Sequence, residues 1–242
     1  MSDLRTVAVI LAGGTGTRFG RPIPKQLIEL AGRPIIEHSI AAFHAAPQID
    51  EIVVLMAPGH LDDVRELVEA SGYDKVTRIL EGGSSRSETT SIALGELGDE
   101  DCRVLFHDAA RPLVTQEIIA AVTEALERFD AVTAAIPSSD TVFEVEESDE
   151  TTLISGVLAR PRLRRCQTPQ GFRRSVLSRA YERAWKDTGF VATDDCSVVV
   201  TYTPEVPVAV VPGDERNLKV TGPDDLHIAE GLIEMSARSD RS

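Results

Sequence analysis

Short apolar segments of strand length alternate with helical patterns from residue 6 to residue 136, and this alternation limits the possible folds more than any other feature. Residues 6–11 read T-V-A-V-I-L, apolar on both faces, which is typical of a strand buried inside a parallel sheet. Helical patterns follow such segments, as right-handed crossovers between parallel strands require. The sequence therefore predicts an α/β fold with a mostly parallel sheet flanked by helices.

The expected strands are residues 6–11, 51–57, 75–80, 103–107, 131–136 and 206–211. The expected helices are residues 34–44, 60–70, 86–97, 115–129, 173–185 and 224–235. The alternation breaks at Pro137, after which two short runs, 141–146 and 152–158, flank an acidic turn and predict a hairpin. Two isolated strands bury little surface, so we expect residues 138–160 to protrude as a dimerisation arm within a single domain of residues 1–242.

The charge balance restricts the partners of this chain. A formal net charge of −14 argues against nucleic acid or an anionic membrane as the main partner, so any phosphate ligand needs a local cluster of cations. No apolar run approaches the ~20 residues that cross a bilayer. The 3 cysteines match no zinc spacing, and reduced thiols of a cytoplasmic protein are the expected state.

A glycine-rich loop, L-A-G-G-T-G-T-R-F-G at residues 11–20, follows the first strand, and P-K-Q comes at residues 24–26. Glycines allow backbone N–H groups to approach phosphate oxygens, at the sheet edge where α/β proteins bind ligands. Phe19 replaces the third glycine of a dinucleotide-binding loop, and no Gly-Lys-Ser/Thr completes a P-loop. Arg18 and Lys25 would instead bring two cations to one oligophosphate, which suits nucleotidyl transfer.

These segments resemble the nucleotide loop of sugar-activating nucleotidyltransferases, and the P-K-Q spacing resembles the 2-C-methyl-D-erythritol 4-phosphate / ribitol 5-phosphate cytidylyltransferase family. The resemblance runs from about residue 7 to residue 230, with the motifs in the expected order. It implies a Rossmann-like sheet of the nucleotide-diphospho-sugar transferase type. It also implies CTP, a phosphorylated sugar alcohol and Mg²⁺ as ligands, and a homodimer.

The resemblance assigns roles residue by residue, with Arg18 and Lys25 as the catalytic cations. It places the nucleotide against two glycine-rich segments and the H-D-A-A-R-P motif at 107–112, through Leu11, Ala12, Gly13, Gly14, Thr15, Gly16, Gly83, Ser84, Arg86, Thr89 and Ala109. The acceptor would contact the same motif, the arm, and the Q-T-P-Q, T-D-D and N-L-K-V-T segments, through Asp108, Arg111, Thr141, Arg160, Thr168, Thr193 and Lys219. Asp108 is also the candidate metal ligand, and Arg160 would enter the neighbouring subunit's site.

Arg160 is one of several arginines in residues 160–165, so the identity of the crossing arginine stays open. A reading in which these arginines are solvated surface charge also stays open. His107 is not assigned a catalytic role, since it could be a buried histidine at the end of a strand.

The expected reaction needs no general base. A phosphate monoester has a second pKa of about 6 and is mostly a dianion at neutral pH, so it can attack the α-phosphorus of CTP directly. Arg18 and Lys25 would stabilise the crowded transition state and the leaving pyrophosphate.

The identity of the acceptor rests on two features that disagree. L-A-G-G at residues 11–14 resembles the ribitol enzymes, but Arg18 and Lys25 are seven residues apart, as in the methylerythritol enzymes, whereas the ribitol enzymes carry two more residues here. Loop length favours methylerythritol phosphate, with ribitol phosphate as the alternative.

Three other classes of protein are alternatives. The first is a non-catalytic nucleotide-binding protein of the same fold. The second is a glycosyltransferase, whose Asp-x-Asp is matched only by D-E-D at residues 99–101, at the wrong edge of the sheet. The third is a dehydrogenase, which Phe19 disfavours.

Overall fold

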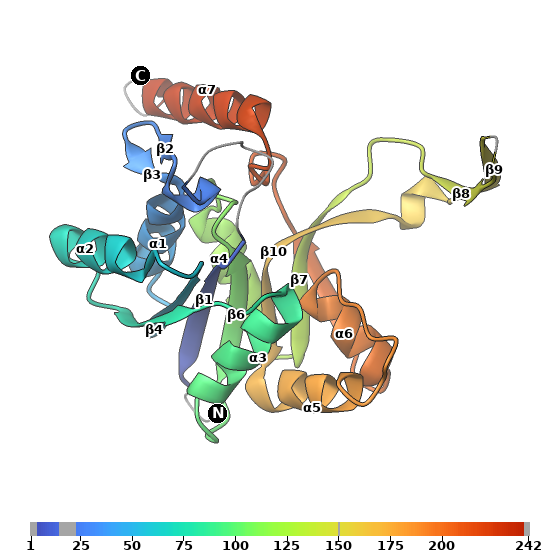
Figure 1. The fold of residues 1–242 in the computed structure, drawn as a ribbon, viewed down its shortest axis with the longest axis horizontal. Helices are drawn as coiled ribbons and strands as arrows, with labels where there is room; N and C mark the ends of the chain where they lie inside the picture. The colour runs from blue at the N-terminus through green and yellow to red at the C-terminus, as the bar shows by residue number, and fades with distance from the viewer. Residues whose placement is uncertain (1–3, 15–22, 150, 240–242) are drawn as a thin grey trace.

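The computed structural model describes residues 4–14, 23–149 and 151–239, and its central element is a seven-stranded sheet (Figure 1). The strand order is β11-β7-β10-β6-β1-β4-β5. The bounds are β1 Thr6–Ala12, β4 Glu51–Met56, β5 Val76–Glu81, β6 Arg103–Asp108, β7 Ala131–Pro137, β10 Arg164–Arg173 and β11 Val208–Pro212. All pairings are parallel except those of β10, which runs antiparallel to β6 and β7. The predicted mostly parallel sheet is confirmed.

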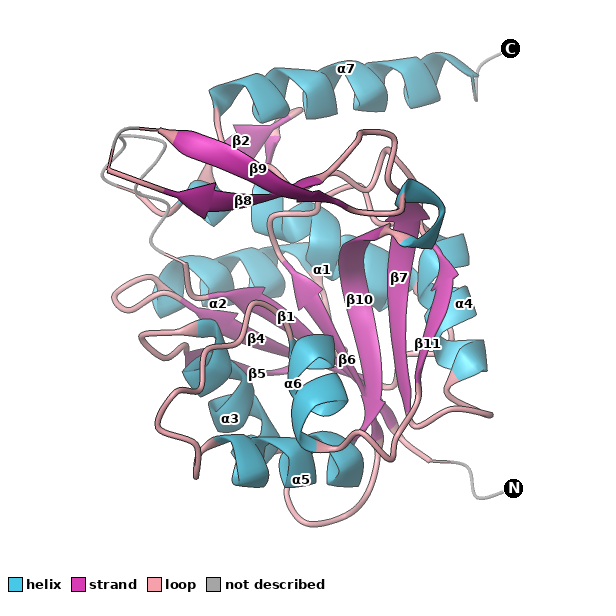
Figure 2. Ribbon diagram, turned by 90° about the vertical axis from the view of Figure 1, so that its right-hand side faces the viewer, coloured by secondary structure: helices cyan, strands magenta, loops and turns pink. Residues whose placement is uncertain are grey.

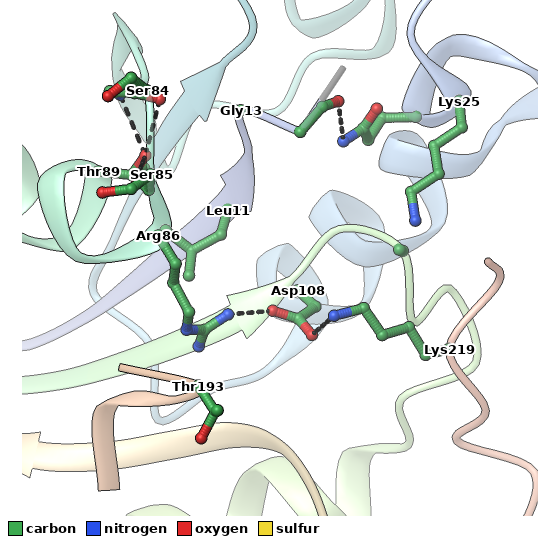
Figure 3. A pocket seen from close by; sticks show the side chains of 14 residues that line it. Leu11, Gly13, Lys25, Ser84, Ser85, Arg86, Thr89, Asp108, Thr193 and Lys219 are labelled. Atoms are coloured by element: carbon green, nitrogen blue, oxygen red, sulfur yellow. Dashed lines mark hydrogen bonds and ion pairs between the residues drawn. The ribbon is translucent and has the colours of Figure 1, made fainter. Parts of the chain in front are cut away.

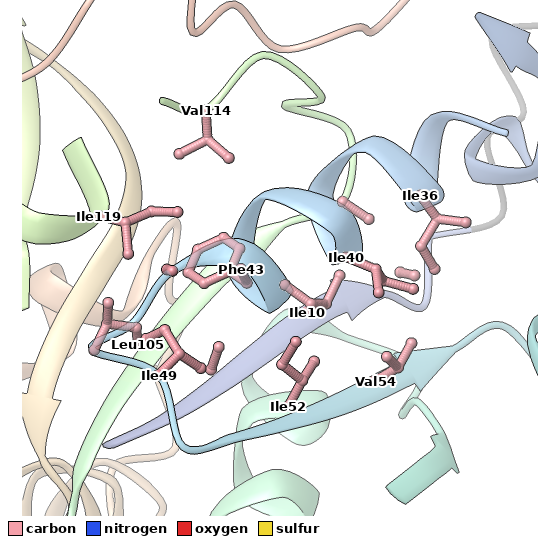
Figure 4. Packing of buried hydrophobic residues seen from close by; sticks show 14 of the residues in the cluster. Ile10, Ile36, Ile40, Phe43, Ile49, Ile52, Val54, Leu105, Val114 and Ile119 are labelled. Carbon is pink, nitrogen blue, oxygen red and sulfur yellow. The ribbon is translucent and has the colours of Figure 1, made fainter. Parts of the chain in front are cut away.

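Helices cover both faces of this sheet (Figure 2). Their bounds are α1 Ile35–Ala45, α2 Leu61–Ser71, α3 Arg86–Glu96, α4 Gln116–Ala125, α5 Arg174–Ala184, α6 Asp195–Tyr202 and α7 Pro223–Ser239. Because side chains alternate along a strand, β1 sends Ala8 and Ile10 into the core beneath α1, α2 and α4, and Val7 and Val9 into the core beneath α3, α5 and α6. Figure 4 shows the first of these cores, where Phe43 and Ile40 of α1 pack on the sheet.

Two regular elements differ from the expectation. Residues 164–173 form β10, although the sequence there predicts only a motif before a helix, because arginines, a proline and a glycine hide the strand pattern. Residues 195–202 form α6, although their valines favour a strand, because the Asp194 side chain accepts the Ser197 N–H at 2.6 Å and caps a helix. The short elements η2 Lys25–Leu27, β2 Glu29–Leu30 and β3 Arg33–Pro34 were also not predicted.

The predicted hairpin is present and projects from the body of the molecule (Figure 1). It consists of β8 Phe143–Glu147 and β9 Thr152–Val157, and the turn η3 Arg160–Arg162 follows it. Its apolar side chains are largely exposed, with Leu153 at 58% and Ile154 at 60%. In the part of the chain that the structure describes, no helix combines the length and apolar character needed to span a bilayer.

Candidate active site

A cleft of about 360 Å³ lies where the carboxyl ends of β1 and β6 meet the start of α3 (Figure 3). It is the sheet edge at which the sequence predicts a ligand. The cleft brings together these predicted residues: Leu11, Gly13, Gly14, Lys25, Gly83, Ser84, Arg86, Thr89, Asp108, Thr193 and Lys219. Gln26, Ser85 and Ala110 also line it and were not predicted. Thr15, Gly16 and Arg18 lie outside the described residues.

The two glycine-rich segments touch each other at the rim of the cleft. A Cβ added at Gly82 would lie 3.2 Å from the Cα of Gly13 and 3.4 Å from Thr89 Oγ1, so a side chain there would push the two segments apart by a few tenths of an ångström. Thr89 Oγ1 accepts the Gly83 N–H at 3.0 Å and donates to the Ser85 carbonyl at 2.8 Å. The Thr89 hydroxyl thereby fixes the turn that leads into α3.

The first turn of α3 is held by two reciprocal contacts. Ser85 Oγ accepts the Glu88 N–H at 3.1 Å, and Glu88 Oε2 accepts the Ser84 N–H at 2.7 Å and the Ser84 hydroxyl at 2.6 Å. These hydrogen bonds from Ser84 lower the pKa of Glu88. Because the Ser84 hydroxyl donates to Glu88, only its acceptor lone pairs remain for a ligand.

Lys25 and Gln26 enter the cleft from the opposite side, on η2. Lys25 Nζ donates to the Val220 carbonyl at 2.9 Å, which links η2 to the segment that carries Lys219. Gln26 Nε2 donates to the Gly14 carbonyl at 3.0 Å, so it holds Gly14 at the end of the described part of the glycine-rich segment. Gln26 stands in the P-K-Q motif, which pointed to this cleft. The sequence alone does not show whether this glutamine supports the loop or faces solvent.

Asp108 is the electrostatic centre of the cleft (Figure 3). Its Oδ1 pairs with Arg86 Nη1 at 2.6 Å and its Oδ2 with Lys219 Nζ at 2.9 Å, and Arg111 Nε lies 3.8 Å away. Burial alone would raise the pKa of Asp108, but Arg86 and Lys219 together lower it far below its ordinary value. Asp108 is therefore a permanently ionised acceptor.

This geometry does not fit a metal held by the protein. Both carboxylate oxygens of Asp108, the candidate metal ligand, are already paired with cations. Among residues 4–14, 23–149 and 151–239, no group of three or more histidines, cysteines or carboxylates could hold a metal ion. Hard cations such as Mg²⁺ need several oxygen ligands, which this cleft does not offer from side chains.

Arg86 connects the cleft to the interior. Its Nη2 pairs with Asp195 Oδ2 at 2.8 Å while its Nη1 holds Asp108. Burial opposes the charge of Arg86, but Asp195 and Asp108 raise its pKa. The guanidinium is therefore balanced by two carboxylates.

The model of the 2-C-methyl-D-erythritol 4-phosphate cytidylyltransferase family matches residues 6–235. The chain belongs to this family. A 2-C-methyl-D-erythritol 4-phosphate cytidylyltransferase from Thermobifida fusca is 50% identical over 232 residues, which are 95% of this chain and 93% of that protein. A bifunctional ribulose 5-phosphate reductase/CDP-ribitol pyrophosphorylase from Haemophilus influenzae is 36% identical over 236 residues, covering 97% of this chain and 49% of that protein. The crystal structure of a 4-diphosphocytidyl-2C-methyl-D-erythritol synthase from Anaerococcus prevotii has a TM-score of 0.85 at 28% identity, covering 96% of this chain and 97% of that chain.

Beneath this cytidylyltransferase cleft, His107 and Thr168 form a closed hydrogen-bond chain. His107 Nε2 lies 3.1 Å from the Arg111 carbonyl, and because a carbonyl can only accept, Nε2 carries the proton. Burial lowers the pKa of His107 to about 4, so the ring is neutral and its Nδ1 accepts from Thr168 Oγ1 at 3.0 Å. Thr168 Oγ1 in turn accepts the Asp108 N–H at 3.0 Å. The hydroxyl expected to donate to the acceptor phosphate therefore donates to His107 instead.

Arg111 also lies behind the cleft wall. Its Nη1 donates to the Asn217 carbonyl at 2.8 Å and its Nη2 to the Cys166 carbonyl at 3.3 Å. Arg111 thus ties the end of β6 to β10 and to the segment before Lys219. Together with its position near Asp108, this makes Arg111 a support for the wall, whereas the sequence suggested a direct contact with the acceptor.

The remaining predicted residues do not line the cleft. Ala12 and Ala109 are fully buried at the ends of β1 and β6. Thr141 and Arg160 are exposed at the base of the arm, where Arg160 Nη1 donates to the Ser139 carbonyl at 3.3 Å. The acidic segment 99–101 precedes β6, so it lies at the sheet edge opposite the cleft, as expected.

Proposed function

We propose that this protein transfers the cytidylyl group of CTP to 2-C-methyl-D-erythritol 4-phosphate and releases pyrophosphate. The observation that carries the proposal is a single cleft that joins a glycine-rich loop and Lys25 to the Lys219–Asp108 ion pair. Family membership supports the reaction, and the 50% identical relative carries this activity in its name. The ribitol alternative is supported by a relative of lower identity, 36%.

The acceptor acts as its own nucleophile in this proposal. Its phosphate monoester, with a second pKa of about 6, is mostly a dianion at neutral pH, so it attacks the α-phosphorus of CTP without a general base. The neutral, buried His107 agrees with this, since it donates away from the cleft. One phosphoanhydride bond breaks, one forms, and pyrophosphate leaves with the negative charge.

Cations aimed at the phosphates supply the rate enhancement. Lys25, on the wall opposite α3, stabilises the charge that develops on the triphosphate as pyrophosphate leaves. We assign Arg18 the same task, on the resemblance of its loop. Both groups act on charge that is greatest in the transition state, so they favour turnover over ground-state binding.

The two substrates bind on different sides of the cleft in this proposal. The start of α3, with Gly83, Ser84 and Thr89, offers backbone groups and hydroxyl lone pairs that suit the base and ribose. Asp108 and Lys219 lie opposite, where an ionised carboxylate accepts hydrogen bonds from the hydroxyls of the sugar alcohol and a lysine contacts its phosphate.

Mg²⁺ is assigned to the substrate in this scheme. Since the described side chains form no cluster that fits the ion, the triphosphate oxygens and water would be its ligands. Bound there, Mg²⁺ would supply charge neutralisation for the triphosphate.

We further propose a homodimer formed through the arm. The arm exposes the apolar side chains Phe143, Val145, Leu153, Ile154 and Val157, which a monomer would leave in water. Arg160, at the base of the arm, does not line the cleft of its own chain. It would complete the acceptor site of the neighbouring subunit, together with Thr141.

The test is identification of the product. The protein is incubated with CTP, Mg²⁺ and 2-C-methyl-D-erythritol 4-phosphate, and the mixture is analysed by mass spectrometry. A CDP derivative of the acceptor, formed together with pyrophosphate, supports the proposal. Recovery of both substrates unchanged from a folded, CTP-binding protein would contradict it.

A further inference from the structure

Asp195 is a carboxylate with no exposed surface, and side chains from two neighbouring helices point at it. Arg86 Nη2 and Thr90 Oγ1, both of α3, each donate to it at 2.8 Å, and the Tyr181 hydroxyl of α5 donates at 2.7 Å. Asp195 begins α6, so the helix N-terminus adds a further favourable field.

Arg86 links this buried carboxylate to the cleft. One end of its guanidinium holds Asp195 and the other holds Asp108, at 2.8 Å and 2.6 Å. A planar guanidinium that is ion-paired at both ends cannot rotate freely. It therefore holds the Asp108 carboxylate in one orientation. Lys219 then meets the second oxygen of Asp108 from the cleft side.

The charges of this chain of ion pairs nearly balance. Arg86 and Lys219 offset Asp108 and Asp195, and Arg111 Nε, 3.8 Å from Asp108, adds one positive charge before any ligand binds. Without Asp195, Arg86 would keep an excess positive charge beside the cleft. It could then swing toward a substrate phosphate, and Asp108 would lose its fixed orientation.

We propose that Asp195 is a positioning residue for the acceptor: it holds Arg86, and Arg86 orients the Asp108 carboxylate toward the hydroxyls of the sugar alcohol. Asp195 does not line the cleft, so it acts only through Arg86. This inference rests on the proposed function of the cleft. It assigns the second aspartate of the T-D-D segment a task that the sequence motif alone does not reveal.

A purely structural role predicts different behaviour. If Asp195 only joined α6 to its neighbours, its hydrogen bonds from Thr90 and Tyr181 would matter as much as its pair with Arg86. If Asp195 positions Asp108, only the pair with Arg86 affects the acceptor. The two roles are therefore separated by variants that remove different partners of the same carboxylate.

The experiment compares Asp195→Asn with Thr90→Val and Tyr181→Phe. Asparagine keeps the shape of the side chain but removes the charge that binds Arg86, so the KM for the acceptor should rise at least about tenfold, with the KM for CTP within about twofold. The two controls should lower the melting temperature and leave the acceptor KM within about twofold. Asp195→Glu, which keeps the charge, should recover part of the loss. Equal effects of Asp195→Asn and the controls, or parallel rises in both KM values, would overturn the proposal.

A measurement without turnover separates this inference from the proposed function. Nuclear magnetic resonance of the Arg86 guanidinium should show hindered rotation about its Cζ–Nη bonds in the wild type and in Tyr181→Phe, and free rotation in Asp195→Asn. Hindered rotation that persists in Asp195→Asn overturns the positioning role whatever the activity. A wild type with a fixed guanidinium and no turnover overturns the proposed function instead.

If Asp195→Asn does not fold, Arg86→Lys replaces it, since lysine cannot grip both carboxylates at once. An unchanged acceptor KM in that variant would equally overturn the proposal.

Discussion

Cations gather in one cleft of a protein whose net charge is −14, and at the scale of single residues their partners decide what each can do. Arg86 is balanced by two carboxylates and Lys219 by one. Lys25 lies on the opposite wall of the cleft, where its Nζ donates to the Val220 carbonyl. This position is the reason that we assign Lys25 to the triphosphate.

Lys25→Ala should lower kcat by about 10²–10³, because one preorganised charge is removed from the transition state. Pyrophosphate release under saturating substrates measures this. Lys75→Ala is the matched control: Lys75 Nζ also donates to a backbone carbonyl, that of Ala46 at 2.8 Å, but does not line the cleft. Near wild-type turnover in Lys25→Ala, or equal losses in both variants, would contradict the assignment.

The buried His107 should make the stability of the folded protein depend on pH. Burial lowers its pKa from 6.5 to about 4, so between those values the unfolded chain binds a proton that the folded chain does not. Stability from this site therefore falls as pH falls through that window, by about 1.4 kcal/mol per pH unit.

Urea unfolding between pH 7 and pH 4.5 should show a flatter loss for His107→Gln than for the wild type, even though the variant is less stable at pH 7. Other titrating groups, such as His38, act equally in both proteins and cancel in the comparison. Parallel curves would mean that His107 is not the neutral acceptor of the Thr168 hydroxyl.

The sequence predicts which segments reach the cleft, but not which of their polar groups bind each other. Thr168 and Arg111 stand in motifs at the expected sheet edge. However, the Thr168 hydroxyl is hydrogen-bonded to His107, and the Arg111 guanidinium donates to two backbone carbonyls. Asp195 stands in the T-D-D segment, and only the three-dimensional contact with Arg86 separates it from a helix-capping residue. Such pairings depend on side-chain directions across strands far apart in sequence, and no local pattern encodes them.

At the scale of elements, periodicity predicts the helices and the parallel strands. A helix with one buried face and a strand with two buried faces each show a regular pattern of apolar residues. It does not predict β10, whose polar and proline-containing sequence is held by pairing with β6 and β7. It does not predict α6, where a cap and packing against α5 override the strand preference of valine. Tertiary contacts decide both elements.

The arm was predicted from its two short runs and its acidic turn, and its exposed apolar side chains motivate the proposed dimer. Ile154→Asp should reduce the mass measured by light scattering from dimer to monomer, since a charge at a buried interface is costly. Val191→Asp is the control, because Val191 is 87% exposed but lies outside the arm. A wild-type monomer, or a dimer that survives Ile154→Asp, would rule out the arm as the interface.

At the scale of the whole molecule, the topology explains why one cleft could be expected at all. In a parallel sheet the carboxyl ends of neighbouring strands meet at one edge, so motifs after β1, β5 and β6 converge there. Thr141 and Arg160 flank the two strands of the arm, and in our proposal they complete the site of a neighbouring subunit.

The proposal that Arg160 completes the neighbouring subunit's site predicts that two inactive variants restore each other. Lys25→Ala and Arg160→Ala, each inactive alone, should regain about a quarter of wild-type activity when co-expressed, because half of the random dimers are mixed and each has one intact site. Arg160 acting within its own chain would give no recovery, since every site would then carry one substitution.

The proposed choice of acceptor is the central claim, and competition tests it most directly. Pyrophosphate release would be followed with CTP, Mg²⁺ and either 2-C-methyl-D-erythritol 4-phosphate or ribitol 5-phosphate over matched concentrations. We expect kcat/KM for the methylerythritol substrate to exceed that for ribitol phosphate by at least about tenfold, a difference that one or two well-placed hydrogen bonds provide. Equal values, or a preference for ribitol phosphate, would contradict the account.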